Sequence, residues 1–467
     1  MFCKTSLVLI LAVASTADTT AASARAAPVP AQETAPGSTP EARATSSDPA
    51  LDELVAEALR NNSELSGTLS SAEAARQRIL PAGTLPDPTV SLNYQNDGKA
   101  FSLGERDMTF LGATFSQPLP WPGKLKLAGE EARNRAEEVK EATVGRARLA
   151  VEARVRRAYY DYLLAREQLE LVEDRSRSWR EISDIVRERY AVGLGLQQDV
   201  LRAQVEVLRL DEARAERGAQ VKSRRAEVNR VLGRPQDAEI ETPAHLTFRP
   251  QAPELPALLQ AVRDRSPELA GVSRAIEAAR LRATLAKKNF LPDFVASAGP
   301  MYRGGLDPMW QVGLGVSLPL YAGSRQRPLL ASAQADVRTE EFRASSARQE
   351  LEFRTRERFE NLTAVLKIAR LYDEGVLPVD QLSLESAISS YRTGKLPFVT
   401  VLEALNTLYA DRALYLTRLA ESEKWSVSID EADLQASTGM AAAAAAASVG
   451  TGSTAAPSTM SSSPSMR

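Results

Sequence analysis

Two long stretches of the chain repeat their apolar residues at steps of mostly three and four. In the first stretch these residues are Val151, Val155, Ala158, Tyr162, Leu169 and Val172, and in the second Leu351, Phe359, Leu362, Leu366 and Ala369. This is the period of an amphipathic helix. We predict one long helix over about Leu125–Tyr190 and another over about Gln326–Tyr391. Roughly 65 residues rising about 1.5 Å each make a rod of about 100 Å, which indicates coiled-coil-like rods and not a compact domain.

Four short stretches instead alternate apolar and polar residues, which predicts strands. These strands are Thr89–Gln95, Asp107–Ser116, Asp293–Met301 and Met309–Leu318. The apolar side chains that share one face are Val90, Leu92, Tyr94, Trp310, Val312, Leu314, Val316 and Leu318. A strand that faces lipid needs this alternation. A half-buried strand of an ordinary soluble sheet has the same pattern, so both interpretations stay open.

The chain also repeats itself in two halves, 51–241 and 255–431, each with the same predicted elements. Leu85-Pro86-Asp87 matches Leu291-Pro292-Asp293, and three other segments recur in the same order at a spacing of about 200 residues. In each half a first helix precedes the strands, and a Gly-containing break leads from the long helix into a last one. We predict the first helices at about Leu51–Ile79 and about Leu255–Lys288, and the last ones at about Gln197–Val231 and about Phe398–Ile429.

The remaining segments have no pattern of a packed core. Lys4, the apolar run Leu7–Val13 and the small residues Ala22-Ser23-Ala24 predict a signal peptide over 1–24. Segments 25–50 and 432–467 are rich in Ala, Ser, Thr and Pro, which predicts disorder. The Pro-rich segment 242–254 is the expected linker between the halves. The single Cys, Cys3, precedes the apolar run, so we expect no disulfide in the mature chain.

Charge and composition exclude several classes of protein. The chain has 58 basic and 60 acidic residues, a net charge of -2, which gives no long-range field for nucleic acid. The single His, His245, rules out zinc motifs that use a pair of His residues, and we interpret it as structural or solvent-exposed. The sequence contains no Gly-x-Ser-x-Gly motif and no phosphate-binding loop. We therefore expect no catalytic site, no cofactor and no bound metal.

The strands limit how the chain could enter a membrane. No stretch after the signal is apolar enough for a transmembrane helix, so we expect any membrane-spanning part to be a closed β-barrel. Four strands per chain cannot close, and two chains would give an eight-stranded barrel filled by side chains. Three chains would give twelve strands with an open lumen, so a conduit requires at least a homotrimer.

Together these features resemble the TolC family of outer-membrane efflux proteins, over about Leu51–Glu431. The resemblance rests on the two-fold repeat, on Pro-rich junctions between helix and strand, and on two Tyr-x-x-Gly tips, Tyr190–Gly193 and Tyr391–Gly394. It implies a mainly α fold with a small β part: a long α-barrel in the periplasm and a shared twelve-stranded β-barrel in outer-membrane lipid. It also implies partners, which are a periplasmic adaptor and an inner-membrane pump, expected to be of the RND type.

Two segments are similar to the heavy-metal efflux branch of that family. They are Leu85-Pro86-Asp87-Pro88 and Gln117-Pro118-Leu119-Pro120-Trp121-Pro122-Gly123-Lys124. Export of metal cations is therefore the first expectation. Multidrug efflux and type I protein secretion remain alternatives within the family, and a soluble periplasmic coiled-coil scaffold is the alternative from another class.

The resemblance also implies site residues at the tips of the helical hairpins. The tips expected to meet the adaptor are Val192, Gly193 and Leu194, and Thr393, Gly394 and Lys395. The expected periplasmic gate consists of Asp199, Tyr391 and Glu403, with a Tyr391–Asp199 hydrogen bond holding helices together and Glu403 selecting cations. Each carboxylate has the alternative role of a surface ion-pair partner. Leu396 and Thr400 depart from the family pattern, where a basic and a second acidic residue are expected.

Overall fold

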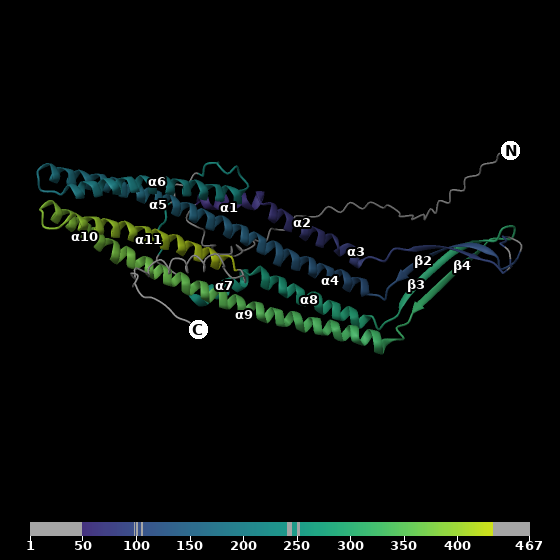
Figure 1. Ribbon diagram of the computed structural model, residues 1–467. Coiled ribbons are helices and arrows are strands. Elements are labelled where there is room, and N and C mark those ends of the chain that lie inside the picture. The colour runs from purple at the N-terminus through teal and green to yellow at the C-terminus, as the bar shows by residue number, and fades with distance from the viewer. Residues whose placement is uncertain are drawn as a thin grey trace, which may run out of the picture. The chain divides into compact units, whose positions relative to one another are not determined.

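The computed structural model describes residues 49–97, 99, 101–103, 106–240, 245–249 and 253–432. All of these residues fall within one compact unit. The expected signal peptide 1–24, nearly all of segment 25–50, part of linker 242–254 and nearly all of tail 432–467 lie outside the described residues. Within the described part the chain is mainly helical with one four-stranded sheet, as the sequence predicts (Figure 1).

The first helix of each half is divided, where the sequence analysis expected one continuous helix. The first half has three helices in its place, α1 (Pro49–Asn61), α2 (Ser63–Gln77) and α3 (Ile79–Gly83). The second half has two, α7 (Leu255–Arg265) and α8 (Pro267–Lys288). Two of the three breaks have a capping side chain, and the break between α2 and α3 at Arg78 has none. Asn62 Oδ1 accepts a hydrogen bond from the N–H of Leu65 at 2.9 Å, and Ser266 Oγ accepts one from that of Leu269 at 3.4 Å.

Each predicted long helix is interrupted by a π-helical turn. In the first half α4 (Lys124–Glu138) passes through Val139–Val144 into α5 (Gly145–Ala191). In the second, a π-helical turn at Ala322–Gln326 precedes α9 (Arg327–Leu371), and another at Tyr372–Val376 leads into α10 (Leu377–Arg392). This last turn lies directly before Pro378, which has no N–H for the helical ladder. The last helices, α6 (Gln197–Leu232) and α11 (Phe398–Asp430), lie within one residue of their predicted bounds.

The sheet is antiparallel throughout, in the order β1-β2-β3-β4. Its strands are β1 (Thr89–Gln95), β2 (Phe110–Leu119), β3 (Asp293–Tyr302) and β4 (Met309–Ser317). Three of them agree with the prediction to within one residue. Strand β2 is shifted: it begins at Phe110 instead of Asp107 and continues to Leu119, because Pro118 pairs with Val295 on β3.

A buried lysine joins the helices to the sheet. Lys124 Nζ lies 2.9 Å from both carboxylate oxygens of Asp293 and donates to the carbonyl of Leu291 at 3.4 Å. The N–H of Trp121 donates to the same carboxylate at 2.7 Å, and the Trp121 ring stacks on Phe294 at 5.8 Å. The Pro-Trp-Pro-Gly-Lys segment of one half is therefore bonded to the Leu-Pro-Asp segment of the other. This contact fixes the direction in which the strands leave the helices.

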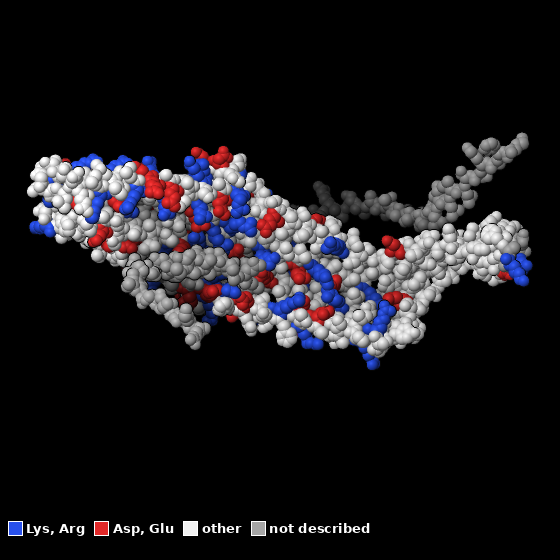
Figure 2. Space-filling view, in the orientation of Figure 1, with Lys and Arg blue, Asp and Glu red and all other residues white. Residues whose placement is uncertain are grey.

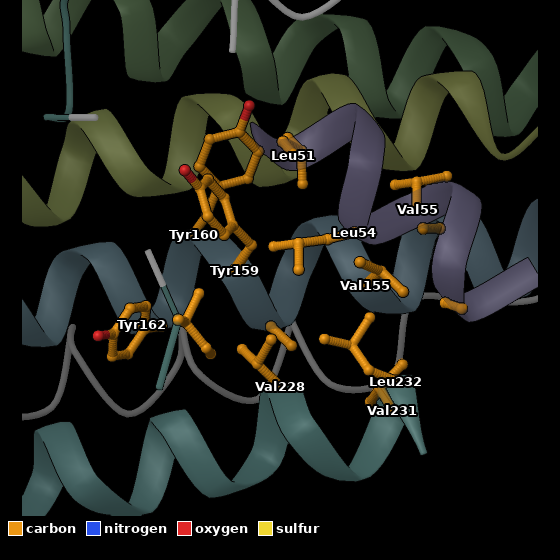
Figure 3. Close-up of a cluster of buried hydrophobic side chains, with 14 of the residues drawn as sticks. Leu51, Leu54, Val55, Val155, Tyr159, Tyr160, Tyr162, Val228, Val231 and Leu232 are labelled. Atoms are coloured by element: carbon orange, nitrogen blue, oxygen red, sulfur yellow. The ribbon is translucent and has the colours of Figure 1, made fainter. Parts of the chain in front are cut away.

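The helices pack side by side around three apolar clusters. Helix α5 packs against both α6 and α11, and α11 packs against α9 and α10 (Figure 1). One cluster joins α1, α5 and α6; Figure 3 shows Leu54, Val155, Tyr159 and Val228 within it. A second cluster fills the hairpin ends of α5, α6, α10 and α11, and a third lies between α7, α9 and α11.

The surface differs between the helices and the sheet. On the face drawn in Figure 2, Lys, Arg, Asp and Glu are spread over the helices, and the strands are almost free of charge. None of the helices in the described residues combines the length and the hydropathy needed to cross a membrane.

Candidate functional site at the helical hairpin tips

Both hairpin tips have the same backbone. Gly193 and Gly394 each adopt φ +76, a left-handed conformation that favours Gly. The next residue donates its N–H back into the helix: Leu194 to the carbonyl of Arg189 at 2.9 Å, and Lys395 to that of Ser390 at 2.9 Å. These bonds, with those from the Gly N–H groups, form a Schellman motif that ends each helix. The predicted Gly-containing break after each long helix is confirmed, and it is a tight turn in both halves.

The side chains at the two tips differ. In the first tip Val192 is 70 % exposed and Leu194 is 71 % exposed, although both are apolar. In the second tip Thr393, Gly394 and Lys395 are exposed, and its apolar residue Leu396 is 38 % exposed. Exposed apolar side chains at the end of a hairpin gain no packing within the chain, so the first tip is the more suitable of the two for contact with a partner.

Arg189 joins the two tips. It lies in the last turn of α5, and its guanidinium donates to the carbonyl of Tyr391, to that of Arg392 at 3.0 Å and to that of Leu194 at 3.1 Å. The same group lies over the Tyr391 ring, 4.7 Å from its centroid. The carbonyl of Tyr391 also accepts the N–H of Gly394 at 3.0 Å. One cation therefore adds a donor to carbonyls at both tips, where few carbonyls have a partner within a helix.

Asp199 and Tyr391 lie near each other, but the hydrogen bond expected between them is not formed. The hydroxyl of Tyr391 is buried and has no hydrogen-bond partner among the described residues. Burial, followed by the charge of Asp199, raises the pKa of the Tyr391 hydroxyl, and Arg189 opposes this rise. Burial likewise raises the pKa of the Asp199 carboxyl, against Arg202 and Arg189. Their coupling is therefore electrostatic, and Arg189 acts on both groups.

Glu403, the third expected gate residue, lies on α11 with its side chain exposed. It makes no ion pair or hydrogen bond with another described residue, so no ion-pair partner for it lies in that part of the chain. Tyr391 and Val401 lie in the buried cluster at the hairpin ends, and Glu403 lies outside that cluster. The three predicted gate residues are thus on neighbouring helices, and only Asp199 and Tyr391 affect each other.

Sequence reasoning missed Arg189. The family pattern led to the expectation of a basic residue near position 396, where this chain has Leu396. The fold instead brings a cation to the second tip from the other half of the chain, a separation of 202 residues from Tyr391. The position of Arg189 directly before the first Tyr-x-x-Gly tip was a sequence signal for a role at the tips. No neighbouring residue in the sequence indicated which groups it would contact.

The predicted lipid-facing side chains share one face of the sheet and are exposed. The register pairs Val90 with Phe115 and Val312 with Ala298, so the apolar residues of all four strands lie on the same face. The opposite face is polar: Thr114 Oγ1 accepts from Asn93 at 3.2 Å and from Gln311 at 2.9 Å. The exposed members of the predicted set are Val90, Leu92, Tyr94, Trp310, Val312, Leu314, Val316 and, just beyond β4, Leu318.

Comparison with known proteins agrees with this arrangement. The family model for outer membrane efflux protein matches residues 54–234 and 258–439. The cobalt-zinc-cadmium resistance protein CzcC of Cupriavidus metallidurans is 23 % identical over 381 residues, which cover 81 % of this chain and 88 % of that protein. The alkaline protease secretion protein AprF of Pseudomonas aeruginosa is 27 % identical over 317 residues, 60 % of this chain and 62 % of that protein.

A solved structure has the same fold. The crystal structure of CusC matches with a TM-score of 0.64 at 18 % identity, and the match covers 83 % of this chain and 92 % of that one. The CusC structures concern the formation of a transmembrane channel, and the matched family is that of outer membrane efflux proteins. The matched family places the protein in the outer membrane, from which it extends into the periplasm. The chain belongs to the outer membrane efflux protein family.

Proposed function

We propose that the chain is the outer-membrane channel of a tripartite efflux system that exports small solutes, metal cations among them. In this proposal the protein is a homotrimer. Its strands form one twelve-stranded barrel in outer-membrane lipid, and its hairpins, arranged by an internal two-fold repeat, form a helical conduit in the periplasm. The tips meet a periplasmic adaptor, which connects the channel to an inner-membrane pump of the RND type.

The observation that carries the proposal is the open, one-sidedly apolar sheet. Strands β1 and β4 each have one neighbour and form the two edges. In lipid an open edge leaves backbone groups without partners, at a cost of several kcal/mol for each group. Three copies joined edge to edge remove every open edge, place the apolar face outward and turn the polar face of Thr114 and Gln311 toward a lumen.

The two outer helices supply a second argument for several copies. Leu201, Val205 and Leu208 are exposed on α6, at steps of one helical turn, and Val379 and Leu382 are exposed on α10. Each set forms an apolar stripe on a helix that is packed on its other side, α6 against α5 and α10 against α11. The α6 stripe of one chain facing the α10 stripe of the next would bury both and close a ring.

The tips supply the proposed adaptor contact and gate. Val192, Gly193 and Leu194 offer an apolar contact, and Thr393, Gly394 and Lys395 a polar one. Asp199, Tyr391 and Glu403 form the proposed gate, with Arg189 added. Because the Tyr391 hydroxyl has no hydrogen-bond partner in the described part of the chain, we assign the closing contact to Arg189, which bonds across the two hairpins. Glu403, exposed and unpaired among the described residues, supplies one carboxylate per chain to a ring that favours cations.

Metal cations are the first proposed substrate. The named function of the relative CzcC and the Pro-Trp-Pro-Gly segment both support this choice. A deletion strain would be grown on copper, silver, zinc, cobalt and nickel salts, and in parallel on lipophilic drugs and detergents. We expect hypersensitivity to metals that the wild-type chain restores. Hypersensitivity to drugs alone would replace this proposal with a multidrug channel.

Type I protein secretion is the second candidate. The identity of 27 % to the secretion protein AprF favours it, although that match covers less of this chain than the match to CzcC. Under this alternative the deletion strain would lose one or more proteins from its culture medium and keep its wild-type resistance to metals.

A further inference from the structure

The only His of the chain lies beside two carboxylates of α5. Glu167 and Glu170 lie one turn apart on that helix, and His245 comes from the segment between the two halves. One ligand atom from each of the three residues lies within 4.8 Å of the other two. These residues are far from the hairpin tips in the sequence and from the sheet, so neither the proposed gate nor the lipid-facing surface uses them.

The group is held in place on one side and open on the other. His245 Nδ1 lies 2.8 Å from Glu167 Oε1, and the same oxygen accepts the N–H of Leu246 at 3.3 Å. Leu246 packs against the cluster of α1, α5 and α6. The side chain of Glu167 is only 16 % exposed and that of His245 is 61 % exposed. One ligand is therefore fixed by packing, and the others face solvent, from which a cation and its water can enter.

The segment that carries His245 is fastened to the helices at its other end as well. Phe248 packs against the cluster of α7, α9 and α11, and Arg249 pairs with Glu423 of α11 at 3.6 Å. His245 therefore does not depend on a cation to reach α5. The position exists before binding, which lowers the ordering cost that a cation site on a free segment would have.

We propose that Glu167, Glu170 and His245 form a surface site for a divalent transition-metal cation of the zinc, cobalt and nickel class. Imidazole nitrogen with carboxylate oxygen suits these cations, whereas magnesium and calcium prefer sites made of oxygen ligands alone. Two carboxylates neutralise the charge of one divalent cation. Three protein ligands leave the remaining positions to water, as the exposure of His245 and Glu170 permits.

A bound cation would join the segment between the halves to α5. None of the three residues belongs to the proposed gate or to the hairpin tips, so the proposal does not depend on the identity of the exported solute. It would let the channel respond to the metal concentration of its surroundings. The opposing interpretation is a plain hydrogen bond between His245 and Glu167 on the protein surface, which the experiment below separates from a metal site.

The single His makes a direct test possible. Diethylpyrocarbonate would be added to the purified full-length protein, prepared without a polyhistidine tag, and modification of His245 followed by its absorbance. We expect zinc to slow the modification at least about 10-fold and magnesium at the same concentration to leave it unchanged. The His245→Ala variant shows that the signal comes from this residue.

Two substitutions on α5 separate the interpretations. Glu170→Gln keeps the contact between His245 and Glu167 and removes one ligand, so zinc should lose its protection. Glu181→Gln, at an exposed position of the same helix, is the matched control and should keep it. Equal rates with and without zinc would overturn the proposal, and so would zinc protection that persists in Glu170→Gln. Either result leaves the growth experiment of the proposed function unaffected.

Discussion

The first tip, Val192–Leu196, and the second tip, Thr393–Pro397, have the same backbone and different side chains. Both end a helix with a Gly at φ +76 and the same pair of backbone hydrogen bonds. Tyr190 and Tyr391 occupy equivalent positions, yet Tyr190 is 46 % exposed and Tyr391 only 4 %. The difference follows from the neighbours: Tyr391 lies between Phe398 and the guanidinium of Arg189.

The comparison distinguishes the features that form the turn of a tip from the side chains that give each tip its proposed role. The turn depends on the Gly and on main-chain hydrogen bonds, so the remaining side chains can vary. The first tip exposes Val192 and Leu194. Before the second tip, Tyr391 in the last turn of α10 is buried beneath the guanidinium of Arg189 from the last turn of α5. We infer that the first tip serves contact with a partner and the second holds the hairpins together.

The largest effect on the structure of the two tips is expected from the removal of Arg189. Arg189→Ala loses the donors to three carbonyls and the contact with the Tyr391 ring, at an expected cost of about 2 kcal/mol to the local stability of the second tip. Amide hydrogen exchange at 391–396 should then be more than about 10-fold faster. The resting conductance of the purified channel in planar bilayers should rise.

Arg187→Ala is the matched control, because Arg187 is exposed on the same turn and pairs only with Asp184 among the described residues, at 3.3 Å. It should leave both the exchange and the conductance unchanged. If Arg189→Ala behaves as Arg187→Ala does, the hairpins are held together by another contact.

Replacing the tip glycines tests the shared backbone. An Ala at φ +76 is strained by about 1–2 kcal/mol, so Gly193→Ala and Gly394→Ala should each accelerate amide exchange of their own tip. The added Cβ at position 394 would also meet Arg189 Nη2 at 3.4 Å, and at 193 it would meet open space. The effect should therefore be at least as large at 394. A smaller effect at 394 than at 193 would contradict the contact with Arg189.

The smallest effect is expected from the Tyr391 hydroxyl. Tyr391→Phe removes a buried polar atom that has no partner among the described residues, so the stability of the second tip should stay equal or increase by up to about 1 kcal/mol. Resting conductance should be unchanged. A raised conductance in this variant would mean that the hydroxyl bonds to a neighbouring chain. The hydroxyl would then belong to the contact that closes the gate.

The sequence predicted the regular parts of this fold because their signals are local. Apolar residues at helical steps marked the hairpins, alternation marked the strands, and Gly193 and Gly394 marked the turns. The breaks at Asn62 and Ser266 were missed, although both are capping residues followed by an acidic residue in the next turn, a visible signal of a new helix. The π-helical turn at Tyr372–Val376 contains Gly375 and ends two residues before Pro378, and both residues interrupt the helical pattern in the sequence. No such pattern marks the turn at Val139–Val144.

The contacts that involve distant residues could not be predicted in the same way. Arg189 and Tyr391 belong to different halves, as do Lys124 and Asp293. His245 was interpreted from its own surroundings as structural or exposed, and only the fold shows it beside Glu167 and Glu170 of another segment. Pattern along a chain specifies elements and turns. It does not specify which charged side chains meet across them.

The most direct test of the proposed channel is a cross-link between neighbouring chains. Val205 on α6 and Leu382 on α10 are exposed, and each lies 12 residues along the chain from the glycine of its tip, Gly193 or Gly394. In a Cys3→Ser background, Val205→Cys with Leu382→Cys would be treated in outer membranes with a short bis-maleimide. The proposal predicts a covalent trimer from the double variant and not from either single variant. A product confined to monomers, in protein that still reaches the outer membrane, would contradict a ring of chains joined through α6 and α10.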